Sequence, residues 1–237
     1  MAARGSLGAM EAGPARSSLR FYFDYVSPYA YLAWTQIHAL AARHGREVDP
    51  IPVVFGALLA AHGTLGPAEI PAKRRYVYRD AIRTALRLGV AFEPPPAHPF
   101  NPLLALRVSS LAIAPDQRRA LIDALFAATW TGGGGIAGPA EVARAVQRAG
   151  LDGEALVAAA ADAEVKAQLR NQTDEAIAAG AFGVPTIIAS GELFWGFDSL
   201  ANLEAFLRGE MAIDEAVTAR WETLPAAITR KPPPAPR

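Results

Sequence analysis

A serine stands where a strand pattern gives way to a helix pattern, and its hydroxyl is the first candidate for chemistry. Ser27 follows the aromatic run Phe21-Tyr22-Phe23 and precedes Pro28, which suits the first turn of a helix. The first N–H groups of a helix lack internal partners, so they and the hydroxyl point into one small volume that favours an anion. Ser27 is therefore suited to stabilise a bound thiolate, unless it serves only as an ordinary helix cap.

The free energy that a bound thiolate requires is within reach of such a turn. Lowering the pKa of a thiol from ~8.5 to ~6.5 costs roughly 2.7 kcal/mol. One hydrogen bond to a charged group supplies ~1.5–3 kcal/mol, and the helix dipole adds ~0.3–1 kcal/mol. The thiol has to come from a ligand, because none of the 237 residues is a cysteine.

A second candidate is the dipeptide Val184-Pro185, which follows Gly183 and precedes the strand pattern Thr186–Ala189. A cis peptide bond at Pro185 would leave the backbone groups of Val184 unpaired and turned outward. An extended peptide could then pair with Val184. With a trans bond, Val-Pro-Thr is a common start to a strand.

Composition narrows the class of function. The formal net charge is zero, so no overall field attracts nucleic acid or anionic lipid, and no run is long and apolar enough to span a bilayer. Without cysteine there is no disulfide, thiolate metal site or Cys-x-x-Cys redox pair. The four histidines lack the spacing of metal ligands, so we expect no metal. Small-molecule chemistry in the cytoplasm is the expectation.

Periodicity predicts the elements that hold the two candidates. Alternation from Leu19 to Tyr25 indicates a strand, and a helix follows from Pro28 to about His44. A second strand is expected over 48–55, near a sheet edge because of its prolines. Residues 67–180 read as several helices, and strands over 186–189 and 192–195 flank a Ser190-Gly191 turn before a last helix near Asp198. The pattern is an α/β core split by a helical insertion.

Four segments in this order resemble 2-hydroxychromene-2-carboxylate isomerases: 21–29, 66–74, 180–186 and 194–198. That family is similar to kappa-class glutathione transferases. Both have a thioredoxin-like fold with a DsbA-type, all-helical insertion, and the resemblance covers about residues 19–210. It implies a thioredoxin-like domain over 19–62 and 183–210 and an insertion over 63–182. We expect a disordered extension over 1–18 and a C-terminal segment over 211–237 with a proline-rich tail.

The resemblance also implies that glutathione is the cofactor. Ser27 would hold its sulfur as the thiolate, Val184 before Pro185 would pair with the tripeptide backbone, and Asp198 would receive the glutamyl amino group. Lys73 would contact a glutathione carboxylate. Residues that line the same implied site are Pro28, Tyr29, Thr64 and Phe197. Two of these depart from the family, since relatives often carry Asn or Gln near Thr64 and a polar residue at Phe197.

Candidate substrate contacts lie in the segment 98–107, which resembles part of the isomerase family. Asn101 and Arg107 are the residues proposed, and Arg107 could clamp a substrate carboxylate bidentately. A surface arginine with no such role is equally consistent with the pattern. Trp130 is expected in the core, and the glycine run 132–135 is expected to be a connection rather than a phosphate-binding loop.

The implied reaction is a glutathione-dependent isomerisation of an aromatic oxo acid. Thiolate adds reversibly to the unsaturated, ring-opened 2-oxo acid, a bond that is temporarily single rotates, and elimination regenerates glutathione. One alternative is a kappa-like glutathione transferase that conjugates an electrophile. Another is a redox-silent DsbA-like protein that binds peptides without chemistry. Relatives are often dimers, so a homodimer is an expectation.

Overall fold

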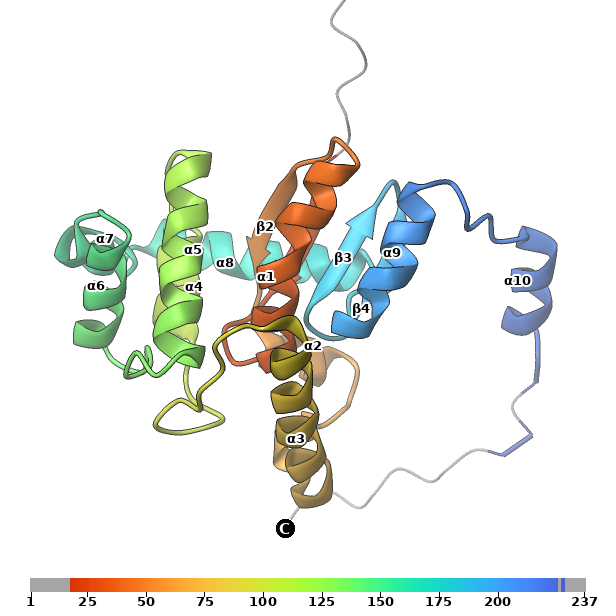
Figure 1. Ribbon diagram of the computed structural model, residues 1–237, viewed down its shortest axis with the longest axis horizontal. Coiled ribbons are helices and arrows are strands. Elements are labelled where there is room, and N and C mark those ends of the chain that lie inside the picture. The colour runs from red at the N-terminus through yellow and green to blue at the C-terminus, as the bar shows by residue number, and fades with distance from the viewer. Residues whose placement is uncertain (1–17, 226, 229–237) are drawn as a thin grey trace, which may run out of the picture.

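The computed structural model describes residues 18–225 and 227–228, and it shows a four-stranded sheet with helices on both faces (Figure 1). The strands are β1 (Leu19–Phe23), β2 (Val48–Pro52), β3 (Thr186–Ala189) and β4 (Glu192–Trp195). Their order is β2-β1-β3-β4, in which β1 and β2 are parallel and the other two pairs antiparallel. The expected edge position of the proline-bearing strand β2 is therefore confirmed.

Helices account for most of the described chain between β2 and β3. The helices are α1 (Pro28–Arg43), α2 (Phe55–Ala61), α3 (Pro71–Leu88), α4 (Leu103–Ser109), α5 (Pro115–Trp130), α6 (Pro139–Arg148), α7 (Gly153–Ala159), α8 (Ala163–Ala178), α9 (Leu200–Leu207) and α10 (Glu215–Glu222). Two short 3-10 turns are η1 (Pro67–Glu69) and η2 (Phe197–Ser199). The expected helical insertion is present as α3 to α8.

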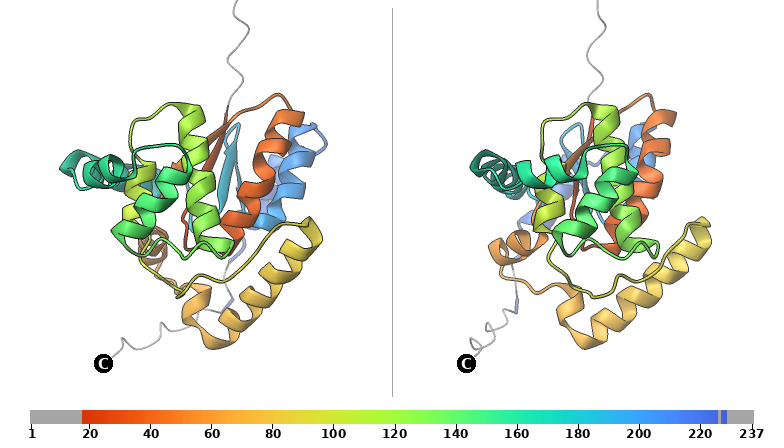
Figure 2. Two further views of the ribbon diagram at one scale, coloured as in Figure 1. Left: turned by 60° about the vertical axis from the view of Figure 1, so that its left-hand side comes forward. Right: turned by 90° about the vertical axis from the view of Figure 1, so that its left-hand side faces the viewer.

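Alternation along β1 sends successive side chains to two different cores. Phe21 and Phe23 pack in the larger cluster with α1 and α5, whereas Tyr22 packs in a second cluster with residues of α2 and α8. Both faces of the sheet are thus covered, by α1 and α9 on one side and by α8 on the other (Figures 1 and 2). The larger cluster runs without a break from the sheet into α4, α5 and α6. The insertion is therefore packed directly against β1, the strand that leads to Ser27.

The second strand is shorter than its sequence predicts, and the expectation that it reaches Phe55 is wrong. The last sheet-like bond is made by the Val53 N–H, which donates to the Phe23 carbonyl at 2.9 Å. After that the Val54 N–H donates to Thr173 Oγ1 at 3.1 Å, and the Phe55 N–H donates to Asp24 Oδ2 at 2.9 Å. Side chains from distant segments take the donors that a longer strand would use, and α2 begins at Phe55 instead.

The expected turn between β3 and β4 is confirmed by its backbone angles. Ser190 has a φ of 52° and Gly191 a φ of 92°, the two positive values that a tight hairpin turn of the primed type requires. The helix expected near Asp198 also begins close to that position, with η2 over Phe197–Ser199 leading into α9.

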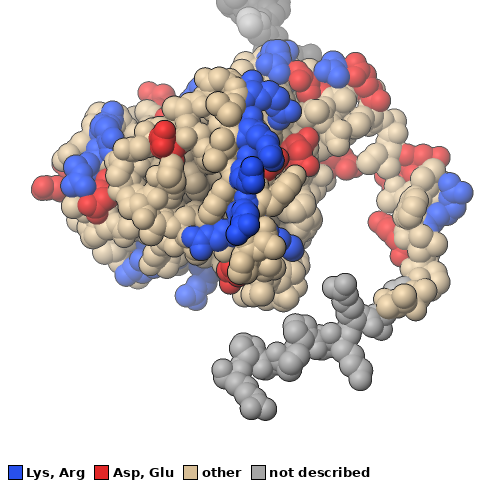
Figure 3. Space-filling model, turned by 60° about the horizontal axis from the view of Figure 1, so that its bottom comes forward, with Lys and Arg blue, Asp and Glu red and all other residues tan. Residues whose placement is uncertain are grey.

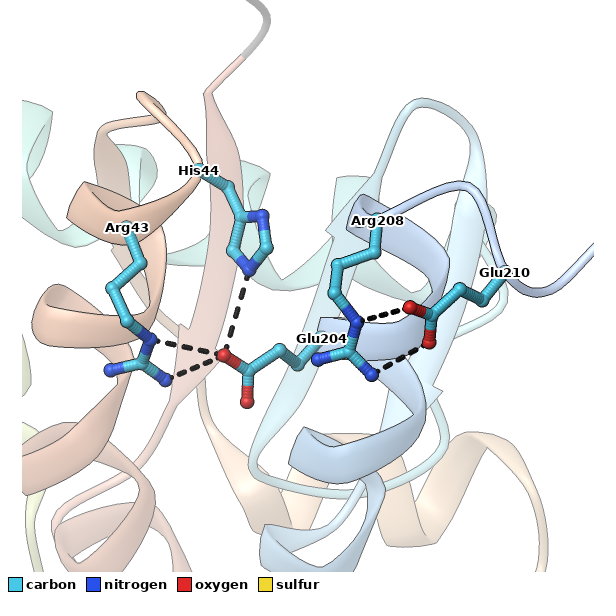
Figure 4. A network of polar contacts seen from close by, with 5 residues as sticks. All are labelled: Arg43, His44, Glu204, Arg208 and Glu210. Atoms are coloured by element: carbon cyan, nitrogen blue, oxygen red, sulfur yellow. Dashed lines mark hydrogen bonds and ion pairs between the residues drawn. The ribbon is translucent and has the colours of Figure 1, made fainter.

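An ion-pair network joins the end of α1 to α9 (Figure 4). Arg43 donates through two nitrogens to Glu204 Oε1, at 3.0 and 2.8 Å, and Arg208 pairs with Glu210. Solvent reaches all of these groups and screens their charges, so each pair contributes little to stability. Within this network, only the contacts of Glu204 cross from the end of α1 to α9, whereas the Arg208–Glu210 pair lies just after α9.

The expected N-terminal extension, up to residue 17, and the expected proline-rich tail, from residue 229, lie outside the described residues. Helix α10, within the expected C-terminal segment, was not anticipated, and it stands apart from the sheet in Figure 1. No helix in the described part of the chain is long and apolar enough to cross a membrane.

A glycine at the contact between α6 and α7 gives a test of this packing. A Cβ at Gly153 would collide with the backbone carbonyl of Ala143, so Gly153→Ala should lower the free energy of unfolding by about 1–3 kcal/mol. The matched control is Gly56→Ala in α2, where a Cβ meets nothing within 4 Å and should stabilise by about 0.5–1 kcal/mol. Urea denaturation measures both. Equal effects of the two variants would contradict the α6–α7 contact.

Candidate functional site

Ser27 caps α1 and also reaches across to Val184. Its Oγ accepts the Ala30 N–H at 3.1 Å, and its hydroxyl donates to the Val184 carbonyl at 3.2 Å. The side chain is 7% exposed. The two interpretations of Ser27 are therefore not exclusive: it is a helix cap, and its hydroxyl lies at the N-terminus of a 16-residue helix, where the helix dipole favours an anion.

The peptide bond between Val184 and Pro185 is cis, the condition that the sequence-based hypothesis required. No group among the described residues accepts a hydrogen bond from the Val184 N–H. The neighbouring backbone groups do have partners, since Gly183 O accepts from Thr186 Oγ1 and Pro185 O accepts from the Gly196 N–H. The expectation that both backbone groups of Val184 are unpaired and turned outward is therefore wrong for the carbonyl, which belongs to a buried residue and accepts the Ser27 hydroxyl, and only the N–H is an unused donor.

Tyr29, in the first turn of α1, lies close to two acidic side chains. Its hydroxyl donates to Asp80 Oδ2 at 2.8 Å. Burial raises the pKa of Tyr29, followed by the hydrogen bond to Asp80 and, among smaller effects, the charge of Asp198. Asp198 is exposed in η2, which packs against α1, and Phe197 beside it packs against the main core. The structure thus brings Tyr29 and Asp198 to one side of the Ser27 turn.

Lys73 is exposed in the first turn of α3, a helix that packs against α1. Four exposed arginines follow it at intervals of four residues, namely Arg75, Arg79, Arg83 and Arg87. Figure 3 shows a band of basic side chains across this face. None of these cations pairs with an acid among the described residues. The band gives this side of the molecule a positive potential that favours small anions.

Three further residues were predicted to contact the cofactor or the substrate, and none of them forms a hydrogen bond with Ser27. Thr64 is exposed in the loop after α2, and Arg107 is half-buried on α4. The Asn101 Oδ1 accepts the Leu103 N–H at 3.0 Å, so this side chain helps to start α4. The substrate roles of Asn101 and Arg107 and the cofactor role of Thr64 stay predictions.

A buried carboxyl group at the first residue of the turn was not identified from the sequence. Asp24 is 1% exposed, and its two oxygens accept the N–H groups of Val26 and Phe55 at 3.0 and 2.9 Å. Burial raises the pKa of Asp24 to about 7, although these two hydrogen bonds act in the opposite direction. An acidic residue inside an aromatic strand pattern was the only sequence signal for it.

His98 was assigned no role from the sequence, yet it contacts the site turn. Its Nε2 lies 2.7 Å from the Val26 carbonyl, one residue before Ser27. Trp130 is buried as expected, and its indole N–H donates to the Tyr25 carbonyl at 3.0 Å. The glycine run 132–135 forms a tight turn at the end of α5. A Cβ at Gly133 would lie only 2.6 Å from the Ala128 Cα, so this turn leaves no room for a side chain there.

No cluster of three or more His, Asp or Glu side chains within the described ranges could hold a metal ion. The Ser27 turn offers a hydroxyl, a helix N-terminus and one backbone donor. Lys73 and Asp198 lie on α3 and η2, two elements that pack against α1. Such a set is chemically suited to a zwitterionic or anionic small molecule that carries a peptide backbone.

The comparisons with known proteins agree with this architecture. Residues 18–208 match the model of the DSBA-like thioredoxin domain. A 2-hydroxychromene-2-carboxylate isomerase of Pseudomonas putida is 30% identical over 78% of this chain and 91% of that protein. A kappa 2 glutathione transferase of Caenorhabditis elegans is 28% identical over 82% of this chain and 93% of that protein.

A solved structure of a 2-hydroxychromene-2-carboxylate isomerase superposes with a TM-score of 0.73 at 24% identity, covering 88% of this chain and all of the other. The chain therefore belongs to the DSBA-like thioredoxin family. The resemblance to 2-hydroxychromene-2-carboxylate isomerases, expected from four short segments, is confirmed over most of its length.

Because Ser27 has two hydrogen-bond partners, its loss should cost more than the loss of an ordinary cap. Ser27→Ala should lower the free energy of unfolding by about 1–3 kcal/mol, measured without ligand. Asp152→Ala removes the simple cap of α7, which accepts only the Ala155 N–H, and should cost about 1 kcal/mol. A smaller effect at Ser27 than at Asp152 would show that the bond to Val184 contributes no stability.

The buried carboxyl of Asp24 should make stability depend on pH. Its folded-state pKa of about 7 lies above the unfolded value of about 3.9, so the folded protein binds the extra proton between these values. Stability should fall as pH rises from about 4 to about 7, by at most about 1.4 kcal/mol per pH unit. Asp24→Asn should flatten this profile, whereas Asp116→Asn at an exposed position of α5 should keep it. Urea titrations across the range decide; an unchanged profile in Asp24→Asn would refute the assignment.

Proposed function

We propose that this protein is a glutathione-dependent isomerase of the 2-hydroxychromene-2-carboxylate type. The observation that carries the proposal is the 3.2 Å contact between the Ser27 hydroxyl and the Val184 carbonyl at the start of α1. This contact supports the proposal because, in a chain without cysteine, the Ser27 hydroxyl would stabilise a thiolate beside the backbone group of Val184 that would recognise a peptide. Relatives named as isomerases and as glutathione transferases match over most of the chain.

The groups around Ser27 fit the chemistry of glutathione. The Val184 N–H lacks an acceptor among the described residues, which suits a backbone carbonyl of a tripeptide. Lys73 and Asp198 take part in no ion pair within the described chain, and they suit a carboxylate and the glutamyl ammonium group. Tyr29, Pro28 and Pro185 supply apolar surface around the same turn. Thr64 and Phe197 complete the proposed contacts.

Ser27 would act by stabilising charge and not by attacking the substrate. Its hydroxyl can turn from the Val184 carbonyl toward an anion, and the dipole of α1 adds to the attraction. Bound glutathione would supply the nucleophilic sulfur, which adds reversibly to an unsaturated oxo acid so that one bond can rotate before elimination.

The substrate in this proposal is an aromatic oxo acid. Its carboxylate would be attracted by the basic band on α3 and bound by Arg107, with Asn101 beside it. Location in the cytoplasm and assembly as a homodimer are further parts of the proposal.

A kappa-like transferase is the second candidate, favoured by the Caenorhabditis elegans relative. It would use the same bound thiolate but release a conjugate instead of an isomer. A redox-silent protein that binds peptides at Val184 would differ from both, because its binding would not depend on a free thiol.

Calorimetric titration with glutathione and with S-methylglutathione tests the proposal. We expect saturable glutathione binding near neutral pH with proton release, and no proton release with the methylated ligand. Ser27→Ala should reduce the proton release and weaken binding by about tenfold, the equivalent of one charged hydrogen bond of about 1.4 kcal/mol. Absence of glutathione binding at millimolar concentration would refute both the isomerase and the transferase.

The matched control is Ser110→Ala, since Ser110 is also buried but its hydroxyl lies 2.9 Å from both Leu106 O and Gln172 Oε1 in the insertion and can donate to either. It should bind glutathione as the wild type does. Mass spectrometry of products from 2-hydroxychromene-2-carboxylate then separates the candidates, because an isomer keeps the substrate mass and a conjugate gains that of glutathione.

A further inference from the structure

A chain of hydrogen bonds runs from α3 to the peptide group before Ser27. His98, in the loop before α4, contacts the Val26 carbonyl through Nε2 at 2.7 Å and Tyr78 Oη through Nδ1 at 2.8 Å. Arg74 donates through Nε to Tyr78 Oη at 3.0 Å and through Nη2 to the His98 carbonyl at 2.9 Å. Two turns of α3 are thereby connected to the site.

The donor and the acceptor of each of these hydrogen bonds can be assigned, because the carbonyl at one end only accepts and the guanidinium at the other only donates. A carbonyl oxygen only accepts, so His98 Nε2 carries a hydrogen. Burial is the main cause that lowers the pKa of His98 and favours the neutral ring, whose Nδ1 then accepts from the Tyr78 hydroxyl. The Arg74 guanidinium only donates, and it fills the remaining acceptor of Tyr78. Every donor points from α3 toward Val26.

Aromatic neighbours fix the His98 ring in place. Its centroid lies 5.6 Å from that of Trp130 and 5.5 Å from that of Tyr78, the latter at an interplanar angle of 80°. Trp130 itself donates to the Tyr25 carbonyl at 3.0 Å. Two consecutive carbonyls of the turn are therefore held from the same side by two packed rings.

On α3, this series of hydrogen bonds begins at a surface that a ligand can reach. Arg74 and Tyr78 line an open groove of about 390 Å³ together with Ala68, Glu69, Pro71 and Arg75. The groove lies along the start of α3, the helix that carries Lys73.

We propose that His98 is a positioning residue for Ser27, held in its Nε2–H form by Tyr78 and Arg74. By fixing the Val26 carbonyl it fixes the plane of the Val26–Ser27 peptide, which sets where the Ser27 hydroxyl points. This inference rests on the proposed function, because the purpose of the fixed hydroxyl is to stabilise the thiolate of glutathione.

Three variants separate positioning from simple packing. His98→Gln keeps an N–H donor near the place of Nε2, His98→Leu keeps bulk without a donor, and Tyr78→Phe keeps the ring but removes the hydrogen bond to Nδ1. His44→Gln is the matched control, since His44 follows the last residue of α1, at the opposite end from Ser27. Thermal unfolding of each variant reports whether it is folded.

The first readout needs no ligand. In ¹⁵N-labelled protein, the His98 ring shifts should show the Nε2–H tautomer in the wild type and some Nδ1–H form in Tyr78→Phe. The Ser27 amide signal should move in His98→Leu and in Tyr78→Phe but stay near the wild-type position in His98→Gln and His44→Gln. An unmoved Ser27 amide in both His98→Leu and Tyr78→Phe would overturn the proposal.

The second readout is glutathione affinity and the pKa of the bound thiol, followed by thiolate ultraviolet absorbance. His98→Leu should bind about tenfold more weakly, as expected for about 1.4 kcal/mol, with a higher thiol pKa. His98→Gln should recover most of the affinity. Equal losses in His98→Gln and His98→Leu would show a packing role only and overturn the proposal. If wild type binds no glutathione, the proposed function fails, while the Ser27 amide shifts still decide the positioning role.

Discussion

Four residues separate the end of β1 from the start of α1, and the peptide groups of this short turn have to be satisfied away from bulk water. The Ser27 N–H donates to the Asp24 carbonyl, and the Asp24 carboxylate accepts the Val26 N–H. These two bonds are local. The carbonyls of the second and third turn residues instead find donors on Trp130 and His98.

The helical insertion is therefore part of the site even where it lies outside the thioredoxin-like sheet. Trp130 ends α5, and His98 lies in the loop between α3 and α4. An unpaired buried carbonyl costs about 1–3 kcal/mol, so an apolar side chain in place of Trp130 or His98 would lower the stability of the turn. The continuous core between the sheet and α5 keeps both donors in position.

The parts of this architecture that the sequence predicts are those that depend on near neighbours. Alternation gives β1, the Ser27-Pro28 pair gives the start of α1, and Ser190-Gly191 gives the hairpin turn. The end of β2 was placed wrongly because its competing acceptors, Asp24 and Thr173, are 31 and 119 residues away in the sequence. No periodicity reports contacts at such separations.

The same limit explains which residues the sequence singled out as candidates. Ser27, Val184 and Lys73 stand in short segments whose residue order carries a family resemblance. Asp24 and His98 are recognisable only by what surrounds them: burial for the carboxyl, and the facing Val26 carbonyl for the imidazole. Nothing in their immediate sequence distinguishes them from an ordinary strand aspartate and a loop histidine.

The bond from Ser27 to Val184 has a consequence for selectivity. Any anion that binds at Ser27 competes with the Val184 carbonyl for a single hydroxyl proton. A small thiolate gains that proton but leaves a carbonyl without its donor, so its net gain is slight. In the proposed complex with glutathione, a backbone carbonyl of the tripeptide would accept the unpaired Val184 N–H, and a backbone N–H of the tripeptide would donate to the Val184 carbonyl. Under the proposed function the turn would discriminate by an exchange of hydrogen-bond partners, in which only a ligand with its own backbone leaves no group of the protein unpaired.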